Sequence, residues 1–194
     1  MTALVILAAG ESSRLGFPKQ TLLFKGKTLI EIAVEAGLKS KAHTATVILG
    51  ANADKIRPYI SNDSVGVIDN PDWEEGIASS IRLAIQSVND DKNITDVIFM
   101  LSDQPFANRA VIDSLIHKRQ ETGGKIVACT YNDTVGVPAL FNRSLFPQLL
   151  SLNGQEGAKK IIGNYTGDIA TVPFEKGSID IDTIADYEEL LRSL

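Results

Sequence analysis

The fold class is decided by the stretch LVILAAGESSRLGFPK, which spans Leu4 to Lys19. Its first four residues are all apolar, which is typical of a strand buried on both faces of a parallel sheet. The small residues at positions 8–10 let the backbone approach a ligand closely. Gly10 and Gly16 allow turns with positive φ, and successive N–H groups in such a loop can bind an anion. The stretch therefore predicts a buried strand that leads into a ligand-binding loop.

The rest of the chain alternates between short apolar runs and segments with helical spacing. Strands are expected at residues 4–7, 46–49, 65–68, 97–101, 126–130, 136–141 and 169–172. Helices are expected at residues 28–39, 52–60, 76–88, 108–122, 144–150, 156–164 and 184–194, with caps at Thr28, Asn108 and Thr183. This alternation predicts an α/β fold with a mostly parallel sheet and helices on both faces. We expect one domain over residues 1–194, in which the turn-rich segment 136–164 shapes a pocket.

The 194-residue chain has an ordinary globular composition, with 44% hydrophobic and 22% charged residues. A formal net charge of −5 argues against a general nucleic-acid binder, which usually has a basic excess. No apolar run approaches the roughly 20 residues that cross a bilayer, and no basic residue precedes the N-terminal apolar stretch, unlike in a signal peptide. The single cysteine, Cys129, cannot form an internal disulfide. We therefore expect a protein of the reducing cytoplasm.

Two basic residues of the first loop are candidates for phosphate binding. Arg14 offers a planar fork of donors, and Lys19 offers a mobile point charge. The loop is not a P-loop, because five residues separate Gly10 from Gly16 and Phe17 follows, and no G-x-G-x-x-G is present. The alternative, a flexible turn with two solvated basic side chains, stays open on spacing alone.

Carboxylates occur at two distant places that are expected to meet at one edge of the sheet. Asp103 comes directly after strand 97–101. Asp180 and Asp182 alternate in a segment that is expected to form a short strand with both side chains on one face. Mg²⁺ takes one or two carboxylates, and phosphates and water fill its remaining positions. The alternatives are a turn role for Asp103 and a helix-capping role for Asp182.

Motifs spread along the chain resemble those of the molybdenum cofactor cytidylyltransferases within the MobA-like NTP transferases. L-A-A-G-x-S-x-R-[ML]-G-x-x-K covers residues 7–19, and N-P-x-W-x-x-G-x-x-x-S covers residues 70–80. L-x-D-Q-P covers residues 101–105, and D-I-D-T-x-x-D-Y covers residues 180–187. The chain departs from the family pattern at Gln155, where a G-D-x-G-A-[RK] loop usually has aspartate.

The resemblance implies a Rossmann-like fold and transfer of a nucleoside monophosphate from an NTP to a phosphorylated acceptor, with release of pyrophosphate. It implies that the nucleotide-binding residues are Leu7, Ala8, Ala9, Gly10, Ser12, Arg14, Lys19, Gly76, Ser80 and Asp103. Arg14, Lys19 and Asp103 are the candidate catalytic residues. Asp103 and Asp180 are the preferred Mg²⁺ ligands, and Asp182 is the reserve.

Ala9 and Gln104 resemble the cytidylyltransferase branch, which implies CTP as the nucleotide and a molybdenum-bound, phosphorylated pterin cofactor as the acceptor. A guanylyltransferase of the same cofactor stays open, as does a cytidylyl- or uridylyltransferase that acts on a sugar or polyol phosphate. A molybdenum hydroxylase apoenzyme is a further expected partner. The rival from another class is a non-catalytic module that delivers the cofactor to that apoenzyme. Neither nucleic acid nor a membrane is expected as a partner.

Overall fold

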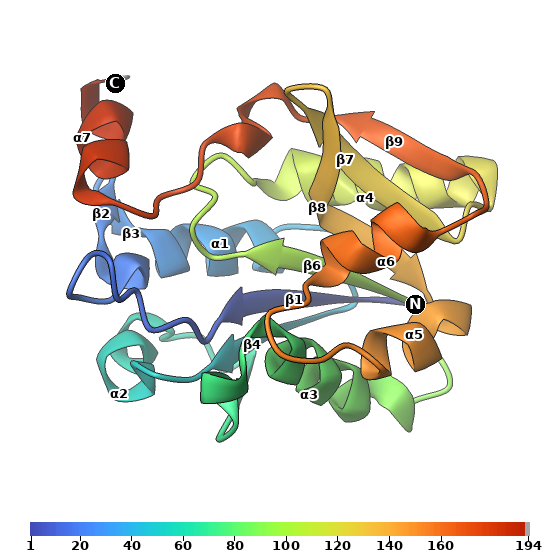
Figure 1. The fold of residues 1–194 in the computed structure, drawn as a ribbon, viewed down its shortest axis with the longest axis horizontal. Coiled ribbons are helices and arrows are strands. Elements are labelled where there is room, and N and C mark those ends of the chain that lie inside the picture. Colours follow the sequence, from blue (N-terminus) through green and yellow to red (C-terminus); the bar gives the residue numbers. More distant parts are fainter. Residues whose placement is uncertain (193–194) are drawn as a thin grey trace.

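A computed structural model describes residues 1–192 of the chain (Figure 1). Its strands are β1 (Thr2–Ala8), β2 (Leu23–Phe24), β3 (Lys27–Thr28), β4 (Thr44–Leu49), β5 (Gly66–Asp69), β6 (Asp96–Leu101), β7 (Ile126–Tyr131), β8 (Thr134–Asn142) and β9 (Ile169–Pro173). Its helices are α1 (Leu29–Leu38), α2 (Ala53–Ile56), α3 (Ile77–Asn89), α4 (Arg109–Thr122), α5 (Phe146–Leu150), α6 (Ala158–Asn164) and α7 (Ile184–Arg192). The last two residues of the helix expected at 184–194 lie outside the described residues. None of the helices in the described range is long and apolar enough to cross a lipid bilayer.

β1 is an inner strand of the seven-stranded sheet that residues 1–192 form, in the order β5-β4-β1-β6-β8-β7-β9. It pairs in parallel with β4 and β6, and the pairs β4–β5 and β7–β9 are parallel as well. β8 runs antiparallel to both β6 and β7. This reversal follows from the connection, because only Asn132 and Asp133, with φ of 46° and 55°, join β7 to β8 in a two-residue hairpin. The mostly parallel sheet predicted from the sequence is confirmed.

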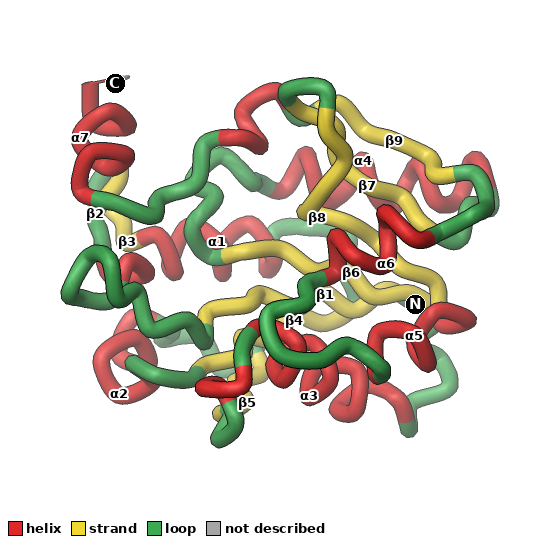
Figure 2. The backbone as a smooth tube through the Cα atoms, viewed as in Figure 1, coloured by secondary structure: helices red, strands yellow, loops and turns green. Residues whose placement is uncertain are grey.

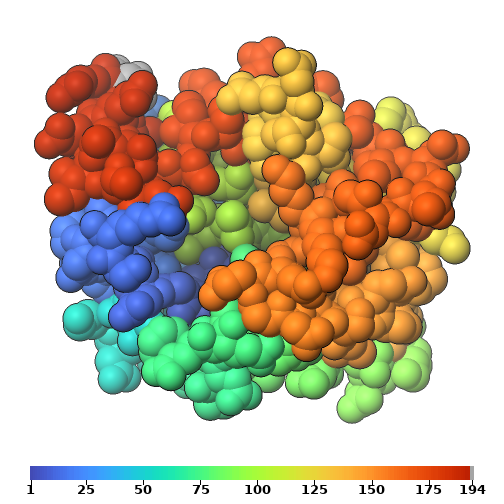
Figure 3. All heavy atoms as spheres, in the orientation of Figure 1, coloured from blue at the N-terminus to red at the C-terminus, as the bar shows by residue number. Residues whose placement is uncertain are grey.

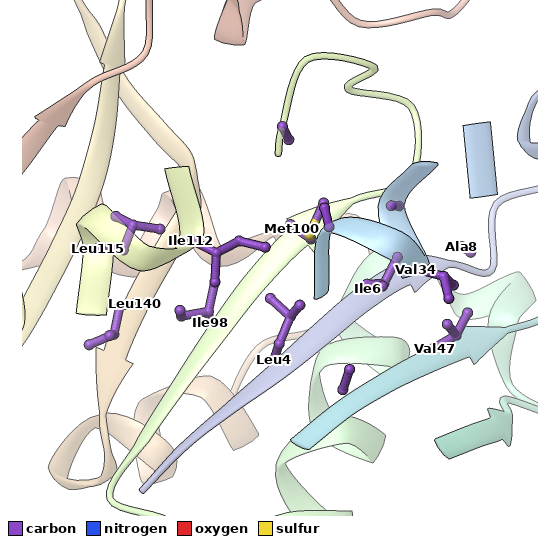
Figure 4. Close-up of a cluster of buried hydrophobic side chains, with 14 of the residues drawn as sticks. Leu4, Ile6, Ala8, Val34, Val47, Ile98, Met100, Ile112, Leu115 and Leu140 are labelled. Carbon is purple, nitrogen blue, oxygen red and sulfur yellow. The ribbon is translucent and has the colours of Figure 1, made fainter. Parts of the chain in front are cut away.

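Helices cover both faces of the sheet, so that the molecule has three layers (Figure 1). α1 and α4 pack on one face, against side chains such as Leu4 and Ile6 (Figure 4). α3, α5 and α6 pack on the other face, against Val5, Leu7 and Phe99. β1 is thus buried on both faces, as its unbroken apolar run predicts. This packing fixes the strand ends from which the candidate site is built.

A third apolar cluster joins the two ends of the chain beside the sheet. Phe24 of the β2–β3 hairpin packs with Ile181 and Leu190 from the C-terminal segment. The hydroxyl of Tyr187 also donates a hydrogen bond of 2.7 Å to a backbone carbonyl oxygen of β2. Figure 1 accordingly shows α7 beside β2 and β3. The cluster brings the acidic residues 180–182 next to the loop that follows β1, although the two segments are far apart in the sequence.

The predicted helix caps form in the structure. Thr28 Oγ1 accepts a hydrogen bond of 3.3 Å from the N–H of Glu31, and the Glu31 carboxylate accepts one of 2.7 Å from the N–H of Thr28. Such a capping box contributes about 1 kcal/mol to helix stability. Asn108 and Thr183 likewise accept hydrogen bonds from N–H groups in the first turns of α4 and α7. Local sequence therefore fixes where these helices begin.

Two local predictions are wrong. The helix expected at residues 52–60 breaks after α2 into a 3₁₀ turn at Arg57–Tyr59, because Pro58 has no N–H with which to continue the α-helical pattern. The segment 180–182 forms no strand. The N–H of Ile181 donates one hydrogen bond of 3.2 Å to the carbonyl oxygen of Asp103, but β6 has already ended and offers no further strand edge.

Candidate active site

The ends of β1 and β6 open into a cavity of about 440 Å³ at the carboxyl edge of the sheet. Because the two strands are parallel neighbours, the loops that follow them leave the sheet at the same edge (Figure 2). The space-filling view shows the molecule hollowed between the N-terminal loop, in blue, and the segment that precedes α6, in orange (Figure 3). The cavity is lined by residues 7–13, 19–20, 73–74, 76–77, 80, 101–103 and 155.

Most of the predicted nucleotide-binding residues line this cavity. They are Leu7, Ala8, Ala9, Gly10, Ser12, Lys19, Gly76, Ser80 and Asp103. Among the described residues, the predicted site residues that lie outside the lining are Arg14, Asp180 and Asp182. Sequence reasoning missed Gln20, whose only signal is that it follows Lys19 directly.

The loop after β1 presents backbone donors beside the cavity. Within the described chain, none of the N–H groups of residues 10–13 donates a hydrogen bond. Gly16 takes a φ of 74° and Ser12 one of 58°, whereas Gly10 does not use the positive φ that glycine allows. A Cβ on Gly10 would enter open space, with no protein atom within 4 Å. The loop therefore has the free donors and the open approach that an anion site needs.

Lys19 reaches from this loop to two carboxylates. Its Nζ lies 2.5 Å from Oδ2 of Asp103 and 2.8 Å from Oδ1 of Asp182. The side chains of Lys19 and Asp103 are only 15% and 11% exposed. Burial by itself lowers the pKa of the Lys19 ammonium, but the two carboxylates outweigh burial, so that the pKa is raised. Lys19 is therefore a fixed positive charge at neutral pH.

Asp103 is suited to hold a divalent cation. Its Oδ2 accepts from Lys19, whereas its Oδ1 is buried and has no hydrogen-bond partner among the described residues. A buried carboxylate oxygen is costly to leave unpaired, so a ligand or cation is expected to satisfy it. No group of three or more His, Cys, Asp or Glu residues in the range 1–192 forms a metal site of its own. A divalent cation whose coordination shell is completed by phosphates and water needs only one or two carboxylates from the protein.

The two C-terminal aspartates flank Ile181, which is fully buried in the third apolar cluster. Asp182 contacts Lys19, whereas the capping role considered for Asp182 belongs to Thr183. Partial burial, and then the charges of Asp103 and Asp182, raise the pKa of Asp180. Asp180 thus lies close enough to interact with the other two carboxylates. The aspartate that shares the Lys19 ammonium with Asp103 is Asp182.

Arg14 does not accompany Lys19 into the cavity. Its side chain is 73% exposed, and its Nη1 lies 3.5 Å from Oδ2 of Asp182. An exposed ion pair at this distance contributes little stability and leaves the guanidinium free to take other partners. The structure therefore brings Lys19, Asp103 and Asp182 together and places Arg14 beside Asp182, outside the cavity lining.

The start of α3 forms another wall of the cavity. Asn70 Nδ2 donates hydrogen bonds of 2.8 Å to Ser79 Oγ and 2.9 Å to Ser80 Oγ, and all three residues are buried. Gly76 precedes the helix with a φ of 121°, and a Cβ at this position would lie 2.4 Å from the carbonyl oxygen of Gly154. Only glycine fits there. Gly76 and Ser80 thus lie at the start of a helix, as predicted from the sequence.

Two buried glutamines fix the backbone around the site. Gln20 Nε2 donates to the carbonyl oxygen of Ala8 at 3.2 Å, which holds the first loop against the end of β1. Gln104 Nε2 donates to the carbonyl oxygens of Gly177 at 2.9 Å and Val137 at 3.3 Å. Gln104 therefore ties the end of β6 to β8 and to the C-terminal segment.

The family model described as the MobA-like NTP transferase domain matches residues 4–169 of the chain. The chain belongs to the MobA-like NTP transferase family. It is therefore a nucleotidyltransferase, with the α/β nucleotidyltransferase fold that the sequence motifs imply. The match covers the first loop, the start of α3 and Asp103, and it ends before the residues 180–182.

Individual relatives carry different names. Nicotine blue oxidoreductase from Paenarthrobacter nicotinovorans is 29% identical over 198 residues, which cover 96% of this chain and 95% of that protein. Molybdenum cofactor cytidylyltransferase from Escherichia coli strain K12 is 24% identical over 186 residues, which cover 94% of this chain and 92% of that protein. The manganese complex of Rv0371C from Mycobacterium tuberculosis has a TM-score of 0.84 and 28% identity, covering 100% of this chain and 99% of that one. Membership of the MobA-like NTP transferase family thus establishes the class of reaction but not the substrate.

Proposed function

We propose that this protein transfers CMP from CTP to the terminal phosphate of a molybdenum-bound pterin cofactor and releases pyrophosphate. The observation that carries the proposal is the cluster of Lys19, Asp103 and Asp182 beside a loop with free N–H donors. Nucleotidyl transfer needs fixed positive charge for the phosphates and carboxylates for a divalent cation, and this cluster has both. The likeness to the molybdenum cofactor cytidylyltransferase over nearly the whole chain supports this acceptor.

The chain's own residues contribute mainly positioning and electrostatic stabilisation. The N–H groups of residues 10–13 bind the triphosphate, and Lys19 stabilises the charge that develops on the departing pyrophosphate. Arg14, exposed beside Asp182, adds a second positive charge once the nucleotide is bound. An oxygen of the acceptor phosphate attacks the α-phosphorus in line, and the bond from the α-phosphorus to the pyrophosphate oxygen breaks. No covalent enzyme intermediate forms.

Asp103, together with Asp182 or Asp180, is proposed to hold a divalent cation such as Mg²⁺. The unpaired Oδ1 of Asp103 supports this assignment, and the manganese complex of the related mycobacterial protein supports a divalent cation. When bound, the cation would neutralise charge on the α-phosphate and the leaving group.

The acceptor is proposed to bind on the side of residues 136–164, which we treat as a subregion of a single domain. Gln104, which follows β6 at the site, donates a hydrogen bond of 3.3 Å to the carbonyl oxygen of Val137 in this segment. A molybdenum hydroxylase apoenzyme is the partner that would receive the finished cofactor.

The test combines the purified protein, the four ribonucleoside triphosphates, Mg²⁺ and the molybdenum-bound pterin, with pyrophosphate release and product mass as readouts. The cytosine dinucleotide is the expected product. A preference for GTP, or transfer only to a sugar or polyol phosphate, would change the substrate and keep the reaction class. Absence of any transfer, with capture of the hydroxylase apoenzyme, would favour the delivery module instead.

A control reaction uses nicotine blue with NADH or NADPH, because one relative is named for nicotine blue. We expect no turnover, since the first loop lacks the G-x-G-x-x-G that binds a dinucleotide in the Rossmann manner.

A further inference from the structure

The segment 152–157, which connects α5 to α6, is clamped over the first turn of α3. Arg82 donates to both carboxylate oxygens of Glu75, at 2.7 and 2.5 Å, and to the carbonyl oxygen of Leu152 at 2.8 Å. Glu75 also accepts from the N–H of Gly154 at 3.2 Å. The carbonyl oxygen of Gly154 accepts in turn from a first-turn N–H of α3 at 3.1 Å. Side chains and backbone together therefore hold the segment in place.

This clamp brings Gln155 to the cavity. Gln155 is a lining residue, and its Nε2 lies so near Gly76 that a Cβ on the glycine would be 2.8 Å away. No hydrogen bond joins the Gln155 amide to another described residue. The backbone of segment 152–157 thus holds the Gln155 side chain at the cavity, and the amide N–H groups and carbonyl oxygen of that side chain are free to bind a ligand.

The two sides of the cavity differ in chemistry. The first loop supplies Lys19 and free N–H groups, which suit phosphates. The side at α3 supplies the aromatic Trp73, the aliphatic Ile77 and the hydroxyl of Ser80, which suit a base and its ribose. Gln155 belongs to this second side, since it lies against the glycine that precedes α3.

We propose that Gln155 contacts the base of the bound nucleotide and lets the cavity accept either pyrimidine. The inference rests on the proposed nucleotidyl transfer. A glutamine amide both donates and accepts, so it pairs with the amino group and ring nitrogen of cytosine or, turned over, with the carbonyl and N–H of uracil. A carboxylate in its place only accepts, and therefore favours the cytosine amino group and repels a uracil carbonyl. Gln155 is accordingly a specificity-determining residue rather than part of the phosphate site.

Calorimetric titration of CTP and UTP, each with Mg²⁺, into the wild type and Gln155→Glu tests the inference. The matched control is Gln148→Glu, which makes the same change at an exposed position of α5 outside this cavity. The wild type is expected to bind the two nucleotides within about tenfold of each other. Gln155→Glu is expected to raise the preference for CTP over UTP by at least about tenfold, the effect of one hydrogen bond to a charged group. Gln148→Glu is expected to leave the ratio unchanged.

An unchanged ratio in Gln155→Glu overturns the inference, as does the same change of ratio in Gln148→Glu or the absence of binding by either nucleotide. Gln155 is exposed, so the variant is expected to fold normally. Binding with the altered ratio, but without transfer to any acceptor, supports the role of Gln155 and overturns the proposed function.

Discussion

Replacing Lys19 with methionine removes the cation that lies 2.5 Å from Asp103 and 2.8 Å from Asp182, and keeps most of the apolar stem. Removal of one partner from a buried ion pair costs about 3–5 kcal/mol, because the other charge stays buried and unpaired. The ion pair between Lys19 and Asp103 is close to this buried limit. Asp182 is 47% exposed and remains solvated, and water reaches Asp103 through the cavity. We therefore expect Lys19→Met to lower the free energy of unfolding by about 2 kcal/mol.

Urea denaturation at pH 7 of the wild type, Lys19→Met, Asp103→Asn and the double variant measures this effect. The double variant should recover most of the loss, since a neutral amide needs no counter-charge, and the coupling should be at least about 1 kcal/mol. Mg²⁺ should stabilise Lys19→Met more than the wild type, because the ammonium no longer competes for the carboxylates. Strictly additive effects, or a loss below about 0.5 kcal/mol, would refute the buried ion pair.

Three further predictions concern other parts of the molecule. Gly76→Ala should destabilise the protein by about 2–3 kcal/mol in urea titration, because Gly76 has a φ of 121° and the new Cβ would lie 2.4 Å from a carbonyl oxygen. The control is Gly163→Ala, whose new Cβ would have no atom within 4 Å. Equal effects of the two substitutions would contradict the argument. Burial raises the pKa of Cys129 to about 12, so iodoacetamide at about pH 8 should alkylate it only in denaturant; modification of the folded protein, seen by mass, would contradict this. Arg82, and then a backbone N–H, hold the pKa of Glu75 at about 2, below its ordinary value of 4.5. The Glu75 carboxylate therefore contributes to stability above pH 4.5, and this contribution is lost as the pH falls toward 2. The melting temperatures of the wild type and Glu75→Gln should converge over that pH range. A constant difference between them would argue against the ion pair.

Much of the fold follows from local patterns in the sequence. The unbroken apolar run of β1 predicts a strand covered on both faces, and the caps at Thr28 and Asn108 fix the starts of α1 and α4. The direction of β8 was not predicted, although the two-residue connection Asn132–Asp133 is its local signal. The β2–β3 hairpin was missed because its strands are two residues each and are stabilised mainly by packing against the C-terminal segment.

The candidate site was predictable where motifs mark it and not where distant segments meet. Asp103 and Lys19 could be identified because each follows a strand that ends at the same edge of the sheet. Which aspartate contacts Lys19 depends on how Ile181 packs into the third cluster, and this is a non-local property. The direction of the Arg14 side chain was not predictable either, because it depends on the turn that the loop makes at Ser12 with its positive φ.

The proposed chemistry depends most directly on Asp103. Pyrophosphate release by Asp103→Asn, with CTP, Mg²⁺ and the molybdenum-bound pterin, is the measurement to compare with the wild type. Loss of one charged group that acts on a developing phosphate charge lowers the rate by about 10²–10³, so this fall is predicted in a variant with a native circular dichroism spectrum. Near-normal turnover in the folded variant would contradict the assignment of Asp103.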